Sequence, residues 1–472
     1  MQKFDAVVTG SGHNGLITAC YLAKNGYRVC VLERQKMIGG AVSTETMFRS
    51  EEFTHGFRMD VGSSVHIMIH QTGIIEELGL TDYGLEYIEM DPFMSYPVPE
   101  GKGVIRFFKD LGRTLDSIRQ VAPEDVEIYR NFVEYWGRIN KGVLKAFMVP
   151  PSGRNIITEI MKGQFRDGSI FKKGEHLDGL HQILGSYGRV VRQSFKNKHM
   201  RAALTWFAAQ SGPLPNQTAT GDFAGWQSML HQSGAKHPKG GSGMLTLAMK
   251  RMIEANGGIV LADSEVRKIE IEDGKATGVI TEDGRSFKGY IVISNAHVQT
   301  TMLKLVGKEH LDDSLFEKVK NIEIGNGFGM VVRNAVSALP DYSAAPDDPF
   351  IHNGMQLLAP STEYMNRAIG DYIKGRPPEN PAVLAMTFSK IDPQMAPKGK
   401  HTLYTWAQWH PYQLAGGLNW EDIREKEADK IWSVVERYAP NMKGKLIDRY
   451  IQTPADIERR HGMLRGNVMH IE

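Results

Sequence analysis

The sequence predicts an α/β protein, in which a Rossmann-type nucleotide-binding domain carries a β-meander and joins a discontinuous second domain of mixed α+β structure. Three observations predict this fold. A glycine-rich turn at residues 10–15 separates an apolar run from a helical pattern. Far downstream, a second helix is followed by hairpin signals between residues 273 and 284. Long segments without these signals separate the two parts, and 472 residues suffice for two or three domains.

The opening of the chain has the order strand, turn, helix, strand. The apolar run Phe4–Thr9 leads into Gly-Ser-Gly-His-Asn-Gly, a helical pattern covers residues 14–25, and a second β-rich run covers residues 27–32. In such a unit, the first glycine permits the tight turn, the second lets a pyrophosphate approach the helix N-terminus, and the third allows close packing of helix and strand. The predicted diphosphate-binding residues are Gly10, Gly12, His13, Asn14 and Gly15.

An acidic residue ends the second strand. Glu33 follows Gly15 by 18 residues, which is close to the spacing of a carboxylate that binds the adenosine ribose. Its charge would repel a 2′-phosphate, whereas the neighbouring Arg34 would attract one. The turn formed by Gly39, Gly40 and Ala41 lies just beyond and favours FAD over NAD, because many FAD enzymes hold a glycine turn there near the diphosphate; an ordinary Gly-Gly loop is the alternative.

The second anchoring segment begins with a helix over residues 244–255 and a short strand over residues 259–261. Asp-Gly pairs at 273–274 and 283–284 separate three strand-like runs, as expected of a meander. We expect its last apolar run, which ends in Asn295 and Ala296, to return beside the first strand and to complete the cofactor site.

The cofactor domain is therefore built from two stretches of chain, and the second domain is inserted between and after them. We assign residues 1–85 and 236–300 to the nucleotide-binding domain, residues 86–235 and 301–440 to the cap, and residues 441–472 to a return toward the nucleotide-binding domain.

The cap carries a long amphipathic helix and two aromatic stretches. A helix that begins near Pro123 places apolar residues at three- and four-residue steps, and the apolar segment 146–151 follows it. Core packing is the first interpretation of this pattern, and contact with a membrane surface is the alternative. The aromatic side chains that we assign to the substrate are Trp206, Tyr404 and Trp406, with plain core packing again as the alternative.

Composition excludes several classes of function. A formal net charge of +2 does not favour nucleic acid as a partner, and no uninterrupted apolar run is long enough to span a bilayer. The two cysteines, Cys20 and Cys30, fall inside predicted core elements and form no CxxC motif. We expect a cytoplasmic protein, with peripheral membrane contact as the alternative. His66 and His70 are four residues apart, as on one face of a helix, but without a third ligand we expect no metal site.

The whole chain resembles the FAD-dependent amine oxidase and phytoene desaturase superfamily, and phytoene-dehydrogenase-related proteins (pyridine nucleotide-disulphide oxidoreductase domain-containing proteins) in particular. The motifs that carry the resemblance are GSGHNG at 10–15, LER at 32–34, IGGA at 38–41, GGSGML at 240–245, EVRKIEIEDGKATGV at 265–279, VISNA at 292–296 and TPADIERRHG at 453–462.

The resemblance implies FAD as cofactor, with Val266 at the adenine ring, and it places Asp60 and His66 near the flavin as candidate catalytic residues. Amine oxidases usually carry arginine at the position of Ala41, so we expect dehydrogenation (desaturation) of a C–C bond in an apolar or aromatic small molecule, with oxygen or a quinone as electron acceptor. The alternatives are a double-bond isomerase, an amine oxidase and a non-catalytic lipid carrier like the Rab GDP-dissociation inhibitors. Relatives continue through a glycine-rich segment that closes over the flavin, so we expect the sequence ending at Glu472 to lack such a segment.

Overall fold

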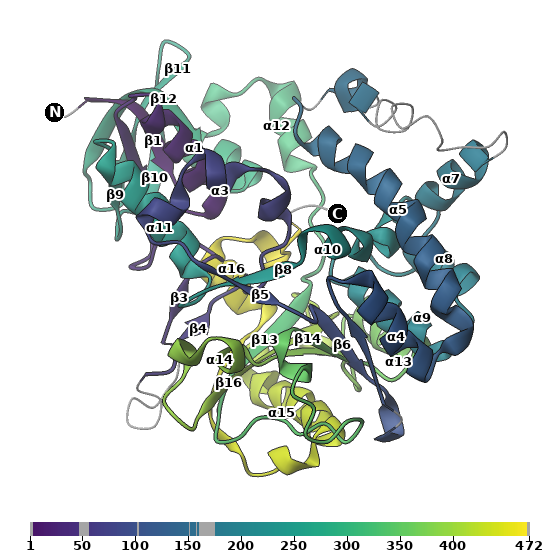
Figure 1. Ribbon diagram of the computed structural model, residues 1–472. Coiled ribbons are helices and arrows are strands. Elements are labelled where there is room, and N and C mark those ends of the chain that lie inside the picture. The colour runs from purple at the N-terminus through teal and green to yellow at the C-terminus, as the bar shows by residue number, and fades with distance from the viewer. Residues whose placement is uncertain are drawn as a thin grey trace.

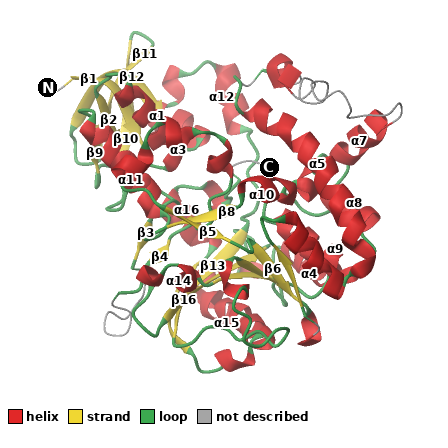
Figure 2. Cartoon of the chain, in the orientation of Figure 1, coloured by secondary structure: helices red, strands yellow, loops and turns green. Residues whose placement is uncertain are grey.

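Two large β-sheets organise the molecule, one of six strands and one of seven (Figures 1 and 2). The computed structural model describes residues 3–46, 56–101, 103–150, 152–156, 158–159 and 175–469. Figure 1 shows the six-stranded sheet at the N-terminal end, the seven-stranded sheet at the opposite end, and a group of helices beside it.

The six-stranded sheet has the strand order β10-β11-β12-β1-β2-β9. Its strands are β1 (Lys3–Thr9), β2 (Val29–Leu32), β9 (Ile259–Leu261), β10 (Val266–Glu272), β11 (Lys275–Thr281) and β12 (Ser286–Ser294). β1 pairs in parallel with both β2 and β12, whereas β10, β11 and β12 form an antiparallel meander. The helices α1 (His13–Lys24) and α11 (Gly243–Ala255) pack on one face of this sheet.

The sequence-based interpretation of this sheet is confirmed. The predicted strand over residues 259–261 is β9, and the chain segment that ends in Asn295 returns beside β1. The first hairpin turns at Asp273 and Gly274, whose φ angles are +50° and +73°. Positive φ at both positions matches the twist of a two-residue hairpin.

The seven-stranded sheet has the strand order β17-β13-β16-β15-β14-β6-β7. Its strands are β6 (Met94–Pro97), β7 (Val104–Phe107), β13 (Gly329–Val336), β14 (Met355–Leu358), β15 (Val383–Met386), β16 (His401–Gln408) and β17 (Leu446–Gln452). Both inserted segments contribute strands to it. The boundaries of the predicted domains remain predictions, and the return toward the six-stranded sheet begins after β17, at α16 (Pro454–His461).

Helices cover both faces of the seven-stranded sheet. One face packs against a helical layer and the other mainly against α15, and the two sides form separate hydrophobic clusters. Besides α1, α11 and α16, the described α-helices are α3 (Ile74–Glu77), α4 (Leu111–Val121), α5 (Val126–Phe147), α7 (Glu175–Leu184), α8 (Tyr187–Ser194), α9 (Lys198–Ala209), α10 (Gln227–Ser233), α12 (Asp313–Lys320), α13 (Thr362–Ile373), α14 (Phe388–Ile391) and α15 (Trp420–Tyr438).

The amphipathic helix predicted near Pro123 begins as a short 3₁₀ turn and continues as α5. Its buried residues include Val126, Tyr129, Val133 and Trp136, so the apolar stripe is a core face, as the first interpretation held.

Two short ribbons connect the halves. β3 (Thr44–Glu45) pairs with β4 (Met59–Asp60), and β5 (Tyr87–Met90) pairs with β8 (Ala235–Pro238). These ribbons bring the second glycine turn, the segment after β4 and the N-terminus of α11 together. α16 lies centrally between the two large sheets in Figure 1.

In the described part of the chain, no helix combines the length and the hydropathy that a membrane crossing requires. Cys20 and Cys30 are both buried and unpaired, as predicted, and burial raises the pKa of each thiol to about 12.

Candidate functional site

The first glycine turn forms a close-packed cradle at the N-terminus of α1. Gly10 has φ +90° and donates its N–H to the carbonyl of Leu32 at 2.8 Å. A Cβ added to Gly12 would lie 2.5 Å from Nδ2 of Asn295, and a Cβ added to Gly15 would lie 2.6 Å from the carbonyl oxygen of Gly10. No side chain caps the N-terminus of α1, which begins at His13, and its first turn carries no acidic residue. Its backbone N–H groups can therefore serve an anion.

Glu33 lies at the end of β2, buried beside this turn. Its Oε2 accepts from the backbone N–H of Ser11 at 2.8 Å and from the Ser11 hydroxyl at 2.6 Å, and its Oε1 accepts from the N–H of Gln35 at 3.0 Å. A carboxylate offers about four acceptor positions, so these contacts orient Glu33 and leave capacity for a ribose hydroxyl.

The second glycine turn packs directly on the first. Gly39 and Gly40 have φ +107° and +57°, and a Cβ on Gly40 would lie 3.3 Å from the Cα of Gly12. The N–H of Gly39 donates to the Ser11 hydroxyl at 3.0 Å, so one serine links both turns and Glu33.

The remaining predicted cofactor residues border the same region, except for one side chain. The N–H of Asn295 donates to the carbonyl of Thr9, and Ala296 follows it. Val266 opens β10 two residues after Ser264, whose N–H donates to the carbonyl of Glu33. Arg34 instead donates from Nη2 to the last carbonyls of α16, those of Arg459 at 3.1 Å and Arg460 at 3.0 Å.

These features fit a dinucleotide such as FAD. A glycine cradle with no room for a Cβ, an uncapped helix N-terminus and a buried, oriented carboxylate supply the groups that a diphosphate and an adenosine ribose require. Gly12, His13 and Gly15 would hold the diphosphate, and Glu33 would hold the ribose.

Asp60 is the centre of a buried polar cluster beyond the second turn. Its Oδ1 accepts from the Thr44 hydroxyl and from the N–H of Ser242, both at 2.7 Å. Its Oδ2 lies 3.9 Å from Nδ1 of His237 and has no hydrogen-bond partner among the described residues. Burial raises the pKa of Asp60, which favours its protonated form.

His237 is a member of this cluster that the sequence analysis missed. Its Nδ1 donates to the carbonyl of Ser64 at 2.9 Å in the tautomer that this contact requires, and its ring stacks on Phe388 with centroids 4.3 Å apart. Within the described chain, His237 Nε2 and Ser64 Oγ have no hydrogen-bond partner. The segment that contains Asp60 and Ser64 therefore carries polar groups poised for a ligand or water.

His66 lies in the same segment, but not on a helix. It forms an isolated bridge with Lys236, whereas His70 belongs to a 3₁₀ turn, so the expectation that they share a helix face is wrong. The His66 Nδ1 pairs with the Tyr87 hydroxyl and its Nε2 with the Ser242 hydroxyl, both at 2.8 Å. Since both nitrogens are occupied, His66 anchors the segment rather than offering a free base.

The burial of His66 predicts a loss of stability in acid. Burial is the largest of the effects that lower the pKa of His66 from 6.5 to about 3. Below pH 6.5, His66 therefore binds a proton in the unfolded chain but stays neutral in the folded chain. The free energy of unfolding falls as the pH drops from about 6.5 toward 3. Between pH 7 and 5.5 this histidine should cost about 1 kcal/mol of unfolding free energy, measurable by urea unfolding.

The His66→Gln variant should lose that part of the pH dependence. The matched control is His181→Gln, because His181 is solvent-exposed and changes its surroundings little on unfolding. An unchanged pH slope in His66→Gln would contradict the assignment.

Arg333 is the second side chain of this polar cluster that sequence reasoning missed. It lies on β13, is completely buried, and donates from Nε to the backbone carbonyl of Asp60 and from Nη1 to Oε1 of Gln452 at 3.1 Å. A single charged residue inside the eight-residue run Gly329–Val336 is the signal that would have revealed it.

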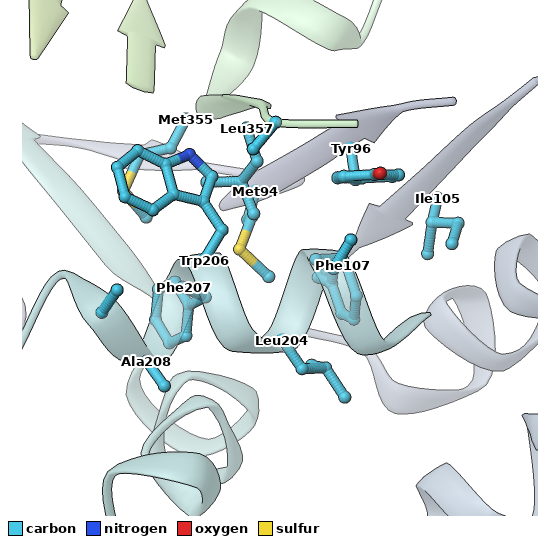
Figure 3. Close-up of a cluster of buried hydrophobic side chains, with 14 of the residues drawn as sticks. Met94, Tyr96, Ile105, Phe107, Leu204, Trp206, Phe207, Ala208, Met355 and Leu357 are labelled. Carbon is cyan, nitrogen blue, oxygen red and sulfur yellow. The ribbon is translucent and has the colours of Figure 1, made fainter. Parts of the chain in front are cut away.

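The predicted substrate residues occupy different places. Trp206 is fully buried on α9, donates from its indole N–H to the carbonyl of Val383 at 3.2 Å, and lies among core side chains such as Met94 and Met355 (Figure 3). Tyr404 lies at the candidate site, where its hydroxyl donates to the carbonyl of Gly62 at 3.0 Å. Trp406 lies two residues further along β16, partly buried against Phe328.

Comparison with known proteins locates this site within a described family. A family model described as flavin containing amine oxidoreductase matches residues 15–338. The mouse protein called pyridine nucleotide-disulfide oxidoreductase domain-containing protein 2 is 27% identical over 508 residues, which cover 99% of this chain and 84% of the relative. The lycopene-forming phytoene desaturase of Pantoea ananas is 26% identical over 98% of this chain and 88% of its own length.

A similar fold is found among solved structures. The crystal structure of an oxidoreductase from Methanosarcina mazei superposes with a TM-score of 0.62 at 19% identity, and it covers 96% of this chain and 88% of its own. The α/β fold with a nucleotide-binding domain and a cap is thereby confirmed.

Proposed function

Because the chain belongs to the flavin-containing amine oxidoreductase family, we propose that it dehydrogenates a carbon–carbon bond of an apolar or aromatic small molecule. Membership makes it an FAD-dependent oxidoreductase and confirms the resemblance seen in the motifs. The alternative of a non-catalytic lipid carrier is therefore not retained.

The observation that carries the proposal is the small side chain at Ala41. Its carbonyl accepts from the N–H of Ser63 at 2.9 Å, and a Cβ on Gly62 would lie 2.9 Å from the Cβ of Ala41. The two segments thus pack tightly at the position where amine oxidases usually carry arginine. The likeness to a phytoene desaturase over nearly the whole chain supports the same conclusion.

The surroundings of Gly62 suit an apolar substrate. Tyr404 holds the Gly62 carbonyl, and Phe388 packs between Tyr404 and His237, with ring centroids 6.4 Å and 4.3 Å away. Asp60 is the acidic side chain of this cluster, and its raised pKa disfavours the charged form that would pair with an ammonium group.

The division of labour follows from these contacts. Bound FAD would supply the acceptor for the hydride that leaves one substrate carbon, and a base or solvent would take the proton from the neighbouring carbon as the double bond forms. The protein orients the substrate carbon through its aromatic side chains and excludes water, while the ribbon of β3 and β4 fixes the position of the segment 60–64. Oxygen or a quinone is the proposed acceptor of the electrons.

We infer a cytoplasmic location with peripheral membrane contact as the alternative. The side chains of Phe147 and Met148, at the end of α5, are 67% and 56% exposed, which supports a surface that could touch a bilayer.

The substrate class can be tested by mixing the oxidised holoenzyme anaerobically with polyenes, fatty acyl compounds, cyclic alkenes and amines. We expect the flavin absorbance to bleach with an apolar compound that carries an oxidisable C–C bond, because hydride transfer needs no external acceptor in a single turnover. Bleaching by primary or secondary amines alone would overturn the proposal. An isomerised product without lasting bleaching would instead identify a double-bond isomerase.

A further inference from the structure

Arg333 is a buried cation with an unused donor. Its side chain is inaccessible to solvent, and its guanidinium carbon lies 5.3 Å from the centroid of the Tyr404 ring. Nε and Nη1 are occupied by the Asp60 carbonyl and by Gln452, whereas Nη2 has no hydrogen-bond partner among the described residues.

No carboxylate of the described residues forms an ion pair with this guanidinium. Burial lowers the pKa of Arg333, and the nearby Asp60 carboxyl only partly opposes that effect. Within the described ranges, no ion pair within 4 Å joins Arg333 to an acidic side chain, in contrast to Arg449 on the adjacent strand, which pairs with Glu425 and Asp429. The side chain of Asp60 is turned to Thr44, Ser242 and His237.

The titratable side chains around Arg333 other than Asp60 add no negative charge. Gln452 Nε2 contacts Nε2 of His461 at 3.0 Å, and burial together with Arg333 lowers the pKa of His461 to about 3, so this histidine is neutral. Tyr404 and Tyr450 have raised pKa values through burial and are neutral too.

A buried charge without an ion-pair partner is unfavourable, because its desolvation is only partly offset. Such a residue is best explained by a ligand that completes its contacts. Arg333 contacts the backbone of Asp60 and the ring of Tyr404, and Tyr404 in turn holds Gly62, so Arg333 adjoins the segment that packs on the second glycine turn. A ligand bound beside this segment is the one that could complete its contacts.

We propose that Arg333 recognises an oxyanion of the ligand in this interior through its free Nη2 donor. Two groups have this chemistry. One is a carboxylate at one end of an otherwise apolar substrate, and the other is the negatively charged pyrimidine ring of the reduced flavin. The inference rests on the proposed function, since both sources require a flavin site beside residues 60–64.

The test uses holoenzyme with bound FAD and three variants. Arg333→Met removes the charge, Arg333→Lys keeps the charge but loses the planar fork of donors, and Arg449→Met removes an arginine of the same sheet that already has carboxylate partners. Circular dichroism and thermal melting establish which variants are folded, and Arg333→Lys keeps the test available if Arg333→Met does not fold.

Two titrations separate the sources. Decanoate and 1-decanol are titrated against the oxidised flavin spectrum, which reports a carboxylate binding near the ring. Sulfite is titrated separately. It adds to oxidised flavin, and the resulting adduct carries a negative charge on the pyrimidine ring, as the reduced flavin does.

If the substrate supplies the oxyanion, Arg333→Met weakens decanoate at least about tenfold and leaves decanol unchanged. If the reduced flavin supplies it, the sulfite adduct weakens by a similar factor while decanoate is unaffected. Arg333→Lys should fall between wild type and Arg333→Met in whichever titration responds. Unchanged affinities for both probes in a folded Arg333→Met or Arg333→Lys variant, or equal losses in Arg449→Met, would overturn the proposal.

Failure of this proposal is distinguishable from failure of the proposed function. An enzyme that purifies with FAD and is bleached by an apolar compound, but whose folded Arg333→Met variant binds both decanoate and sulfite as wild type does, keeps the function and refutes the role of Arg333. Bleaching by amines alone would refute the function, whatever the two titrations give.

Discussion

Gly12→Ala is expected to yield a folded protein that binds FAD about 100-fold more weakly or not at all. The new methyl group would lie 2.5 Å from Nδ2 of Asn295, at the residue that precedes α1, whose first N–H groups have no side-chain cap. It would push the diphosphate away from these donors, and hydrogen bonds to a charged group contribute about 1.5–3 kcal/mol each. Titration of apoprotein with FAD, followed by the quenching of flavin fluorescence, measures the loss.

A matched glycine separates this effect from a general effect of alanine. Gly370 lies within α13, and a Cβ added to it would meet nothing within 4 Å. Gly370→Ala should therefore stabilise the fold by about 0.5–1 kcal/mol and leave FAD affinity unchanged.

The double variant Gly12→Ala with Asn295→Ala identifies the cause of the loss. The Asn295 amide is the end of a side chain and can move, so its displacement alone could account for weaker binding. We expect the double variant to remain defective, because the methyl group still occupies the approach to the helix N-terminus. Full recovery of FAD binding would show that the displaced amide, and not the diphosphate, is the cause.

The nucleotide-binding half was predictable because its signals are local. The glycine turn, Glu33 and the Asp-Gly hairpins each occupy a few adjacent residues, and the backbone geometry they require is reflected directly in residue type. The strand at 259–261 and the pairing of the returning strand with β1 followed from the same pattern.

The polar cluster around Asp60 was only partly predictable because its contacts span the chain. Asp60 meets Ser242 across 182 residues and Arg333 across 273 residues. The sequence analysis selected Asp60 and His66 by resemblance, but His237 and Arg333 were missed. A histidine before a proline carries no local signature, and the charge of Arg333 within an apolar strand marks the residue without showing its partners. Such partners emerge only when the ribbons β3/β4 and β5/β8 bring the two sheets together.

Aromatic residues were the least informative signal. Trp206 and Tyr404 belong to similar aromatic stretches, yet the indole of Trp206 lies deep in the core and the hydroxyl of Tyr404 reaches the Gly62 carbonyl. An aromatic side chain fills either role equally well, so its residue type does not distinguish core from site.

Glu33→Ala is expected to lower FAD affinity about 100-fold while the protein remains folded. The carboxylate is buried and held by Ser11 and Gln35, so its remaining acceptor position has a fixed orientation in which we expect it to meet the ribose. Loss of one hydrogen bond to a charged acceptor, at about 3 kcal/mol, the upper end of the usual range, corresponds to this factor. Apoprotein titrated with FAD measures it, and Glu254→Ala, on the exposed side of α11, is the matched control.

Titration with ADP tests which end of the cofactor Glu33 holds. ADP contains the adenosine ribose and the diphosphate but no flavin, so its affinity should fall by the same factor as that of FAD if Glu33 binds the ribose. Glu33→Gln keeps the side-chain shape and one acceptor oxygen, and we expect its affinities to lie between those of wild type and Glu33→Ala. If Glu33→Ala weakened FAD but left ADP unchanged, the carboxylate would act on the flavin half, and the assignment of the adenosine ribose to the end of β2 would be wrong.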